Sequence, residues 1–218
     1  MMISAQALLF DMDGTLVDSG PAIQQCWDQW VDEYDIDRTR FDQVIGHGIP
    51  ARQIAAQLLP ADTVAAATDR LEQLEIDRAP DLRVLPGTRE LLASLPDDAW
   101  AVVTSCTRPL AEARIKAVGI DPPLLITADD VTTGKPAPEP YLTAARRLGA
   151  DPAHTIAFED APAGLASARA AGTRTVAVTT TTAADQLHGH ADTVVTDLSH
   201  VECAPALEPP VEIHIHTT

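Results

Sequence analysis

Short apolar segments, each followed by a stretch of helical periodicity, constrain the fold of this chain more than any other feature. Five of them indicate buried strands: residues 7–10, 100–103, 124–126, 155–158 and 175–178. Helices are expected at residues 88–94, 109–118, 138–148 and 161–171, around and between the later strands. Alternation of strands with helices is typical of a parallel sheet that is covered on both faces. We therefore predict an α/β fold built on a doubly wound sheet.

A helical segment separates the first of these strands from the others. After Pro21 the apolar residues recur at helical spacing, and the pattern stays helical to Pro80. We therefore expect a discontinuous core of residues 1–18 and 84–200, with residues 19–83 inserted as a helical unit. Active sites of such sheets form at the carboxyl ends of strands, so a unit inserted there can close over the site as a cap. The expected hinge comprises residues 17–20 and 82–86.

Composition limits the classes of function. The 218 residues are 45% hydrophobic, as expected of a globular protein, and their net charge of −17 disfavours nucleic acid and membranes as partners. No window approaches the ~18 apolar residues of a membrane span. The three cysteines lack metal-site spacing, which favours free thiols in a reducing compartment. We expect a soluble, cytoplasmic protein that is a monomer or a weak homodimer.

The segment that follows the first strand carries two carboxylates. Asp11 and Asp13 leave the strand end together, Gly14 allows a sharp turn, and Thr15 adds a hydroxyl. Carboxylates this close repel one another unless a hard cation lies between them or one has a raised pKa. A solvated turn is the commoner explanation of an Asp-x-Asp tripeptide alone. The alternative is an active site in which one carboxylate attacks an electrophile and the other moves protons.

Two later segments offer groups that bind anions. Thr104, Ser105 and Cys106 end a strand, where the Thr104 hydroxyl and the next two backbone N–H groups could hold a phosphoryl oxygen. Small polar residues end many strands, so this feature alone is unspecific. Lys135 lies in a proline-rich turn before a helix and could neutralise a carboxylate and a phosphate together. A solvated surface lysine is the alternative.

A fourth segment places Glu159 and Asp160 between a strand and a helix of small residues. Acidic residues are ordinary caps at helix N-termini. Close to Asp11 and Asp13, they would instead complete the oxygen-rich set of ligands that Mg²⁺ prefers.

Together, the four segments resemble the four motifs of the haloacid dehalogenase-like hydrolase superfamily, over about residues 8–195. The resemblance implies a Rossmann-like core with an inserted α-helical cap. It also implies catalytic roles: Asp11 as the nucleophile, Asp13 as the acid and base, and Thr104 and Lys135 as groups that stabilise the transferring phosphate.

The same resemblance implies a Mg²⁺ site and a phosphate site. The ligands of Mg²⁺ would be the Asp11 carboxylate, the Asp13 backbone carbonyl and Asp160, with Glu159 as a ligand or next to one. Thr15, Ser105 and Cys106 would take part in binding the substrate.

Differences from other branches of the superfamily limit the reactions that this chain is expected to catalyse. Asp13 favours phosphoryl transfer, because the haloacid dehalogenases proper lack a second aspartate. The cap contains no lysine to form the Schiff base of a phosphonatase. β-Phosphoglucomutases usually carry a histidine where this chain has Ile23, so net hydrolysis is favoured over isomerisation. The alternatives are a β-phosphoglucomutase-like mutase and a non-catalytic phosphosugar-binding protein.

The wider motifs resemble those of phosphatases that act on sugar phosphates, including 2-deoxyglucose 6-phosphate, and on glycerol phosphate. The implied substrate is a small phosphorylated sugar or polyol. His47, Gly48 and Arg52 match the cap loop that selects the leaving group in such enzymes.

The tail, residues 201–218, is broken by prolines and ends in an alternating pattern. This pattern predicts an edge strand with His214 and His216 on one face. Packing or solvent exposure explains the two histidines better than a metal site does.

Overall fold

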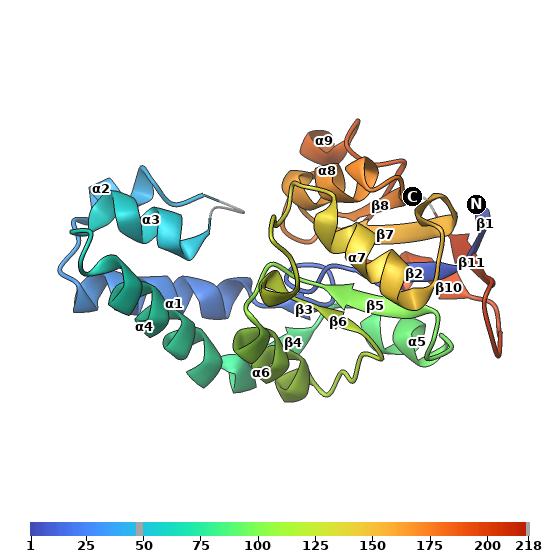
Figure 1. Cartoon of the computed structure of the whole chain (residues 1–218), viewed down its shortest axis with the longest axis horizontal. Coiled ribbons are helices and arrows are strands. Elements are labelled where there is room, and N and C mark those ends of the chain that lie inside the picture. The colour runs from blue at the N-terminus through green and yellow to red at the C-terminus, as the bar shows by residue number, and fades with distance from the viewer. Residues whose placement is uncertain (47–49, 217–218) are drawn as a thin grey trace.

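The computed structural model describes residues 1–46 and 50–216, and consists of a sheet-containing core beside a helical unit (Figure 1). The core contains a parallel six-stranded sheet in the order β6-β5-β2-β7-β8-β9. Its strands are β2 (Ala7–Phe10), β5 (Trp100–Val103), β6 (Leu125–Ile126), β7 (Thr155–Glu159), β8 (Arg174–Val178) and β9 (Thr193–Val195). The α/β fold and the first five of these strands confirm the prediction, whereas β9 was not predicted.

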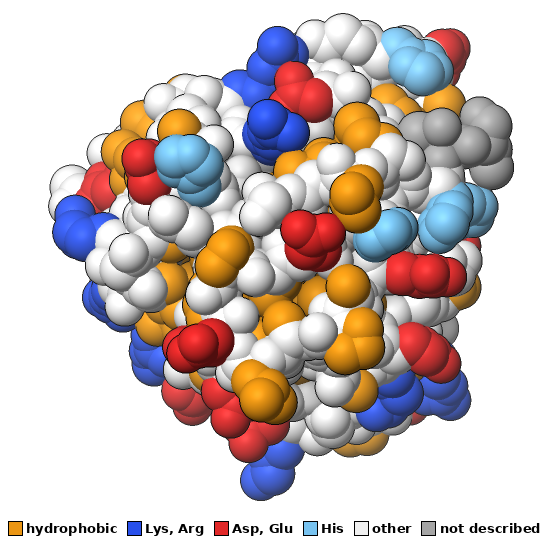
Figure 2. Space-filling view, turned by 90° about the vertical axis from the view of Figure 1, so that its right-hand side faces the viewer, with side chains coloured by type: hydrophobic (Ala, Val, Ile, Leu, Met, Phe, Trp, Pro, Cys, Tyr) orange, Lys and Arg blue, Asp and Glu red, His pale blue; other side chains and the backbone are white. Residues whose placement is uncertain are grey.

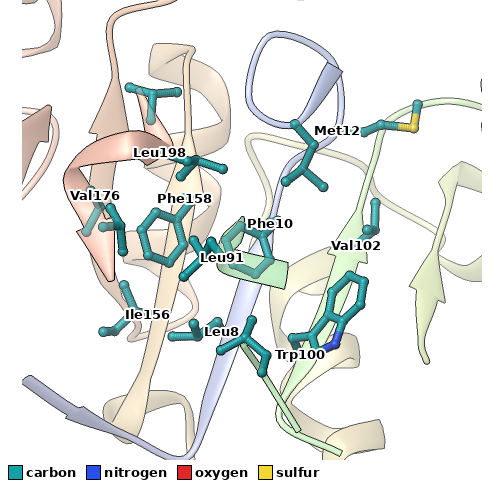
Figure 3. Close-up of a cluster of buried hydrophobic side chains, with 14 of the residues drawn as sticks. Leu8, Phe10, Met12, Leu91, Trp100, Val102, Ile156, Phe158, Val176 and Leu198 are labelled. Carbon is teal, nitrogen blue, oxygen red and sulfur yellow. The ribbon is translucent and has the colours of Figure 1, made fainter. Parts of the chain in front are cut away.

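Helices cover both faces of this sheet. Successive side chains of a strand point to opposite faces, so an apolar strand such as β2 presents apolar side chains to both. Leu8 and Phe10 of β2 belong to one apolar cluster (Figure 3), whereas Leu9 belongs to another on the opposite face. The first cluster includes residues of α5 (Thr88–Ala93) and α6 (Arg108–Val118), and the second includes residues of α7 (Glu139–Leu148) and α8 (Pro162–Ala170). Among the described residues, no helix has the length and apolar character needed to cross a membrane.

The inserted unit is helical and has an apolar cluster of its own. Its helices are α1 (Gly20–Glu33), α2 (Arg38–Asp42), α3 (Ala51–Leu58) and α4 (Val64–Asp77), followed by the short 3-10 helix η1 (Ala79–Asp81). Trp27 and Trp30 pack edge to face in this cluster, and the Trp30 indole N–H donates to the Ala67 carbonyl at 2.8 Å. Two short strands, β3 (Val17–Asp18) and β4 (Arg83–Val84), pair antiparallel where the chain enters and leaves the unit.

The tail forms a strand, but not at an edge. Strand β11 (Val211–Ile215) lies in the middle of a three-stranded antiparallel sheet, between β1 (Met2–Ala5) and β10 (Val201–Cys203). Its alternate residues Val211, Ile213 and Ile215 are buried in the same apolar cluster as β2, which explains why the tail is part of the core. The edge-strand prediction was therefore wrong. Figure 2 shows this end of the molecule, where acidic, basic and apolar side chains are interspersed.

Candidate active site

Three predicted motifs meet at the carboxyl ends of β2, β5 and β7, which are neighbouring parallel strands. Lys135, from the loop between β6 and α7, places its Nζ 2.6 Å from Asp11 Oδ1 and 2.6 Å from Glu159 Oε1. The same Nζ donates to the Val103 carbonyl at 2.9 Å. Strand β2 is the point at which the strand order reverses, and crevices at such points are the usual ligand sites of open α/β sheets.

The charges of this cluster are buried and shift one another's protonation. Burial raises the pKa of Asp11 to about 7, and the repulsion of Glu159 adds to this while Lys135 opposes it. Burial also raises the pKa of Glu159. Burial disfavours the charge of Lys135, but the attraction of the two carboxylates outweighs this and holds its pKa above the ordinary value. The lysine therefore stays a cation, with three acceptors around it.

The carboxylates of Asp11, Glu159 and Asp160 form a set that fits a divalent cation. Their three ligand oxygens all lie within 4.8 Å of one another, and all three residues are buried. Buried carboxylates at this spacing repel each other, and Lys135 offsets only part of their charge. Hard oxygen donors of this kind suit Mg²⁺ or Ca²⁺ better than the softer transition metals. The three residues can therefore hold a divalent metal ion.

The first motif and the fourth are in direct contact at Gly14. Its φ of +83° is one that other residues rarely adopt, and a Cβ there would lie 2.3 Å from Asp160 Oδ2. The loop after β8 joins the same site, because the Thr181 hydroxyl donates to Asp160 Oδ2 and the Thr180 hydroxyl donates to the Gly14 carbonyl. The sequence indicated a loop for these threonines but gave no sign of this contact.

Asp13 lies beside a different partner. Its Oδ1 is 2.6 Å from Arg114 Nη1, and its Oδ2 accepts the Cys106 thiol at 3.3 Å. Arg114 Nη2 also lies 2.9 Å from Oε2 of Glu75, which belongs to α4 of the helical unit. Neither Arg114 nor Glu75 was predicted from the sequence to be a site residue. The available signal was an arginine on the apolar face of α6, because Arg114 has the helical spacing of its buried residues Leu110, Ala111, Ile115 and Val118.

The residues predicted to bind phosphate differ in their burial and in their hydrogen-bond partners. Thr104 is buried, and its Oγ1 accepts the Cys106 N–H at 3.1 Å, so this N–H is engaged within the loop. Ser105 is exposed. The Thr15 hydroxyl is buried and has no hydrogen-bond partner within residues 1–46 and 50–216.

Of the three cap residues predicted to contact substrate, only Arg52 is described, and it is exposed on α3. His47 and Gly48 lie outside the described residues. A further residue that the sequence did not single out is Tyr141 of α7, whose buried hydroxyl donates to Glu159 Oε1 at 2.5 Å.

Comparison with known proteins places this site in a family. A sequence profile described as haloacid dehalogenase-like hydrolase matches residues 5–172. The chain is 39% identical to hexitol phosphatase A of Escherichia coli K12 over 180 residues, 79% of this chain and 82% of that protein. It is 34% identical to glycerol-1-phosphate phosphohydrolase 2 of Saccharomyces cerevisiae over 197 residues, 83% of this chain and 77% of that protein.

A solved structure supports the fold. CbbY from Rhodobacter sphaeroides, in complex with phosphate, superposes with a TM-score of 0.77 at 22% identity, over 89% of this chain and 95% of that chain. The profile spans most of the chain and contains the four segments that meet at the sheet edge. The chain therefore belongs to the haloacid dehalogenase-like hydrolases, and the two relatives reported above, each matched over most of this chain, are phosphatases.

Proposed function

We propose that this protein is a Mg²⁺-dependent phosphatase that hydrolyses a small sugar or polyol phosphate through an aspartyl-phosphate intermediate. The observation that carries the proposal is the contact of Lys135 Nζ with both Asp11 and Glu159, at 2.6 Å each. It joins residues of three motifs at the end of the central strand. Hexitol and glycerol-1-phosphate phosphatases among the relatives support the choice of substrate class.

In the first step, an oxygen of the Asp11 carboxylate attacks phosphorus and the bond from phosphorus to the ester oxygen breaks. Asp13 gives its proton to the departing oxygen, so that an alcohol leaves rather than an alkoxide. In the second step Asp13 takes a proton from water, which attacks the phosphorus of the aspartyl phosphate. The bond to Asp11 breaks, inorganic phosphate is released, and both aspartates return to their initial states. Lys135 offsets negative charge on the transferring group and on Asp11.

Residues Asp11, Glu159 and Asp160 would hold the Mg²⁺ ion, together with the backbone carbonyl of Asp13. Three buried carboxylate oxygens within 4.8 Å of one another support this assignment. When bound, the ion supplies positive charge that stabilises the transferring phosphoryl group. Thr104 and Thr15 offer buried hydroxyls for its oxygens, and Ser105 and Cys106 lie beside Thr104.

We also propose residues 19–83 as a cap that selects the leaving group. Its separate apolar cluster and the paired strands at its base support a unit that can move as a whole. Arg52 is an exposed cation on this unit, and His47 and Gly48 remain predicted substrate contacts. Ile23 packs against the apolar cluster of the cap, which is a structural role.

We further propose a cytoplasmic location for this protein. Cys26, Cys106 and Cys203 are all free thiols, which supports a reducing, cytoplasmic compartment. A monomer or a weak homodimer is proposed, and sedimentation velocity over a range of protein concentrations tests it.

A phosphate-release assay with Mg²⁺ over a panel of sugar and polyol phosphates tests the function. We expect release from at least one member of the panel and none from the Asp11→Asn variant. Isomerised product that depends on a bisphosphate activator would identify a mutase, and binding without turnover would identify a phosphosugar-binding protein. Full activity of Asp11→Asn would overturn the nucleophile assignment.

A further inference from the structure

Arg114 is a buried cation that joins the two parts of the molecule at the site. It is 3% exposed, and its guanidinium contacts Asp13 of the first motif and Glu75 of cap helix α4 at 2.6 and 2.9 Å. A third contact runs from Nη1 to the Cys106 sulfur at 3.3 Å. The two carboxylates come from different parts of the chain, and neither belongs to the helix that carries the arginine.

Stability alone gives a weak reason for an arginine at this position. Its neighbours on the buried face of α6 are apolar, and buried ion pairs are often replaced by apolar side chains at no cost in stability. Removing only one partner is costly, because the others stay buried and charged. The arginine is better explained by what it does to the carboxylates that it contacts.

The contacts fix the direction of the Asp13 carboxylate. Arg114 faces Oδ1, and the Cys106 thiol donates to Oδ2, so both oxygens are held from the side of α6. Oδ1 lies 2.6 Å from Arg114 Nη1 in an ion pair and is itself buried. Arg114 thus holds Oδ1 in a buried position, and the exposed part of the Asp13 side chain, which is 23% exposed, lies at its other atoms.

The cap completes this arrangement. Glu75 lies on α4, and one turn earlier Glu72 accepts the hydroxyl of Thr107, which precedes α6, at 2.9 Å. These two contacts join α4 to the start of α6 and its middle. Because Glu75 and Asp13 share one guanidinium, displacement of α4 would change the position of Arg114 and, with it, of Asp13.

We propose that Arg114 is a positioning residue that orients the Asp13 carboxylate toward the leaving-group oxygen. Glu75 makes this orientation depend on the position of the cap. The proposal rests on the proposed function, in which Asp13 protonates the leaving group. It adds a route by which the cap acts on proton transfer without touching the substrate.

The test compares two esters that differ in their need for a proton. An alkyl ester such as glycerol phosphate needs Asp13 as the acid, whereas the nitrophenolate of p-nitrophenyl phosphate leaves without a proton. The parameter kcat/KM reports on steps through transfer to Asp11. We expect Arg114→Met to lower kcat/KM about 10- to 100-fold for the alkyl ester and less than about 3-fold for the aryl ester. Arg114→Lys should lie between Arg114→Met and the parent protein.

Further variants separate positioning from folding. Lys116→Met removes an exposed cation from the same helix and should leave both esters unaffected. In the Asp13→Asn background, Arg114→Lys should not change the alkyl-to-aryl ratio further, because its effect passes through Asp13. Glu75→Gln should lower the ratio less than Arg114→Met does, while the exposed Asp69→Asn on α4 should not lower it. Melting temperatures identify any variant that fails to fold, and Arg114→Lys then supplies the readout.

These measurements distinguish failure of the Arg114 proposal from failure of the proposed function. An equal loss on both esters in Arg114→Lys, or an unchanged ratio, overturns the role of Arg114 while Asp11→Asn remains inactive. If Asp11→Asn and Asp13→Asn hydrolyse both esters like the parent protein, the proposed function itself is wrong.

Discussion

The Cα of Gly164 in helix α8 faces the carboxylate of Glu159 with no space between them for a methyl group. A Cβ built on Gly164 would lie 2.0 Å from Glu159 Cδ and from its Oε1. Glu159 ends β7 and Gly164 lies near the start of the following helix, so the small residue lets that helix approach the strand end. This closeness fixes Glu159 between the helix, Lys135 and Tyr141.

We expect Gly164→Ala to displace the Glu159 carboxylate and so weaken the proposed metal site. Loss of a group that orients metal ligands typically costs about 10- to 100-fold in affinity, and we expect a loss of this size for Mg²⁺. Isothermal titration calorimetry measures the affinity, and kcat/KM should fall in parallel. Ala166→Ser adds an atom at an exposed position of the same helix and serves as the control. Equal Mg²⁺ affinity in Gly164→Ala and the parent would contradict the role of Glu159.

Tyr141→Phe should destabilise the protein, because it deletes a buried hydrogen bond to a carboxylate. The hydroxyl donates to Glu159 Oε1 at 2.5 Å, and hydrogen bonds to charged groups contribute about 1.5–3 kcal/mol. We expect a decrease of this size in the free energy of unfolding, measured by urea denaturation in the presence of a chelator. Tyr34→Phe, at the only other tyrosine, is the matched control. A Tyr141→Phe variant as stable as the parent would show that the bond contributes nothing.

The core of the fold was predictable because its sequence signals are local. Strand β2 is four apolar residues followed directly by Asp11, and its neighbours in the sheet are the apolar strand β5 and strand β7, which is apolar over residues 156–158. Local signals also made the position of Lys135 predictable, because prolines restrict the conformation of its loop and this loop lies at the carboxyl end of a parallel sheet. The contact between Lys135 and Asp11, 124 positions apart, follows from the topology rather than from the local sequence.

The rest of the site depends on tertiary contacts that leave little trace in the sequence. Helical spacing places Arg114 on the apolar face of α6, but the local sequence does not reveal its partner Glu75, which lies in a different unit. Thr181 gave no signal, since a hydroxyl in a loop has no fixed target until β8 and β2 are paired through β7. Strand β11 alternates as edge strands do, and only its pairing with both β1 and β10 places it in the centre.

Binding of Mg²⁺ should strengthen with pH because of Asp11. Burial raises the pKa of this carboxyl to about 7 in the metal-free protein, so it is largely protonated at pH 6 and must lose this proton to bind a cation. We expect Mg²⁺ to bind about tenfold more weakly at pH 6 than at pH 8. Calorimetry in two buffers of different ionisation enthalpy should also detect proton release near pH 6. In Asp11→Asn, affinity should be lower, and this proton release should be absent; equal release in both proteins would assign it elsewhere.

The stability of the metal-free protein should carry a pH dependence from Glu75. Burial raises the pKa of this carboxyl from its ordinary 4.5 to about 7, against the pull of Arg114. Between these two pH values the native state therefore binds a proton that the unfolded state has lost. By linkage, the contribution of Glu75 to the free energy of unfolding is largest below pH 4.5, decreases as pH rises, and is constant above pH 7.

Glu75→Gln removes this titration, so its free energy of unfolding should decrease less between pH 5 and pH 7.5 than that of the parent. Urea denaturation in a chelator at several pH values measures both slopes, and other buried carboxyls contribute equally to the two proteins. Glu112→Gln replaces a glutamate of α6 whose side chain is 59% exposed, and it should keep the slope of the parent. The assignment is wrong if Glu75→Gln and the parent have parallel profiles, because Glu75 would then titrate alike in the folded and the unfolded chain.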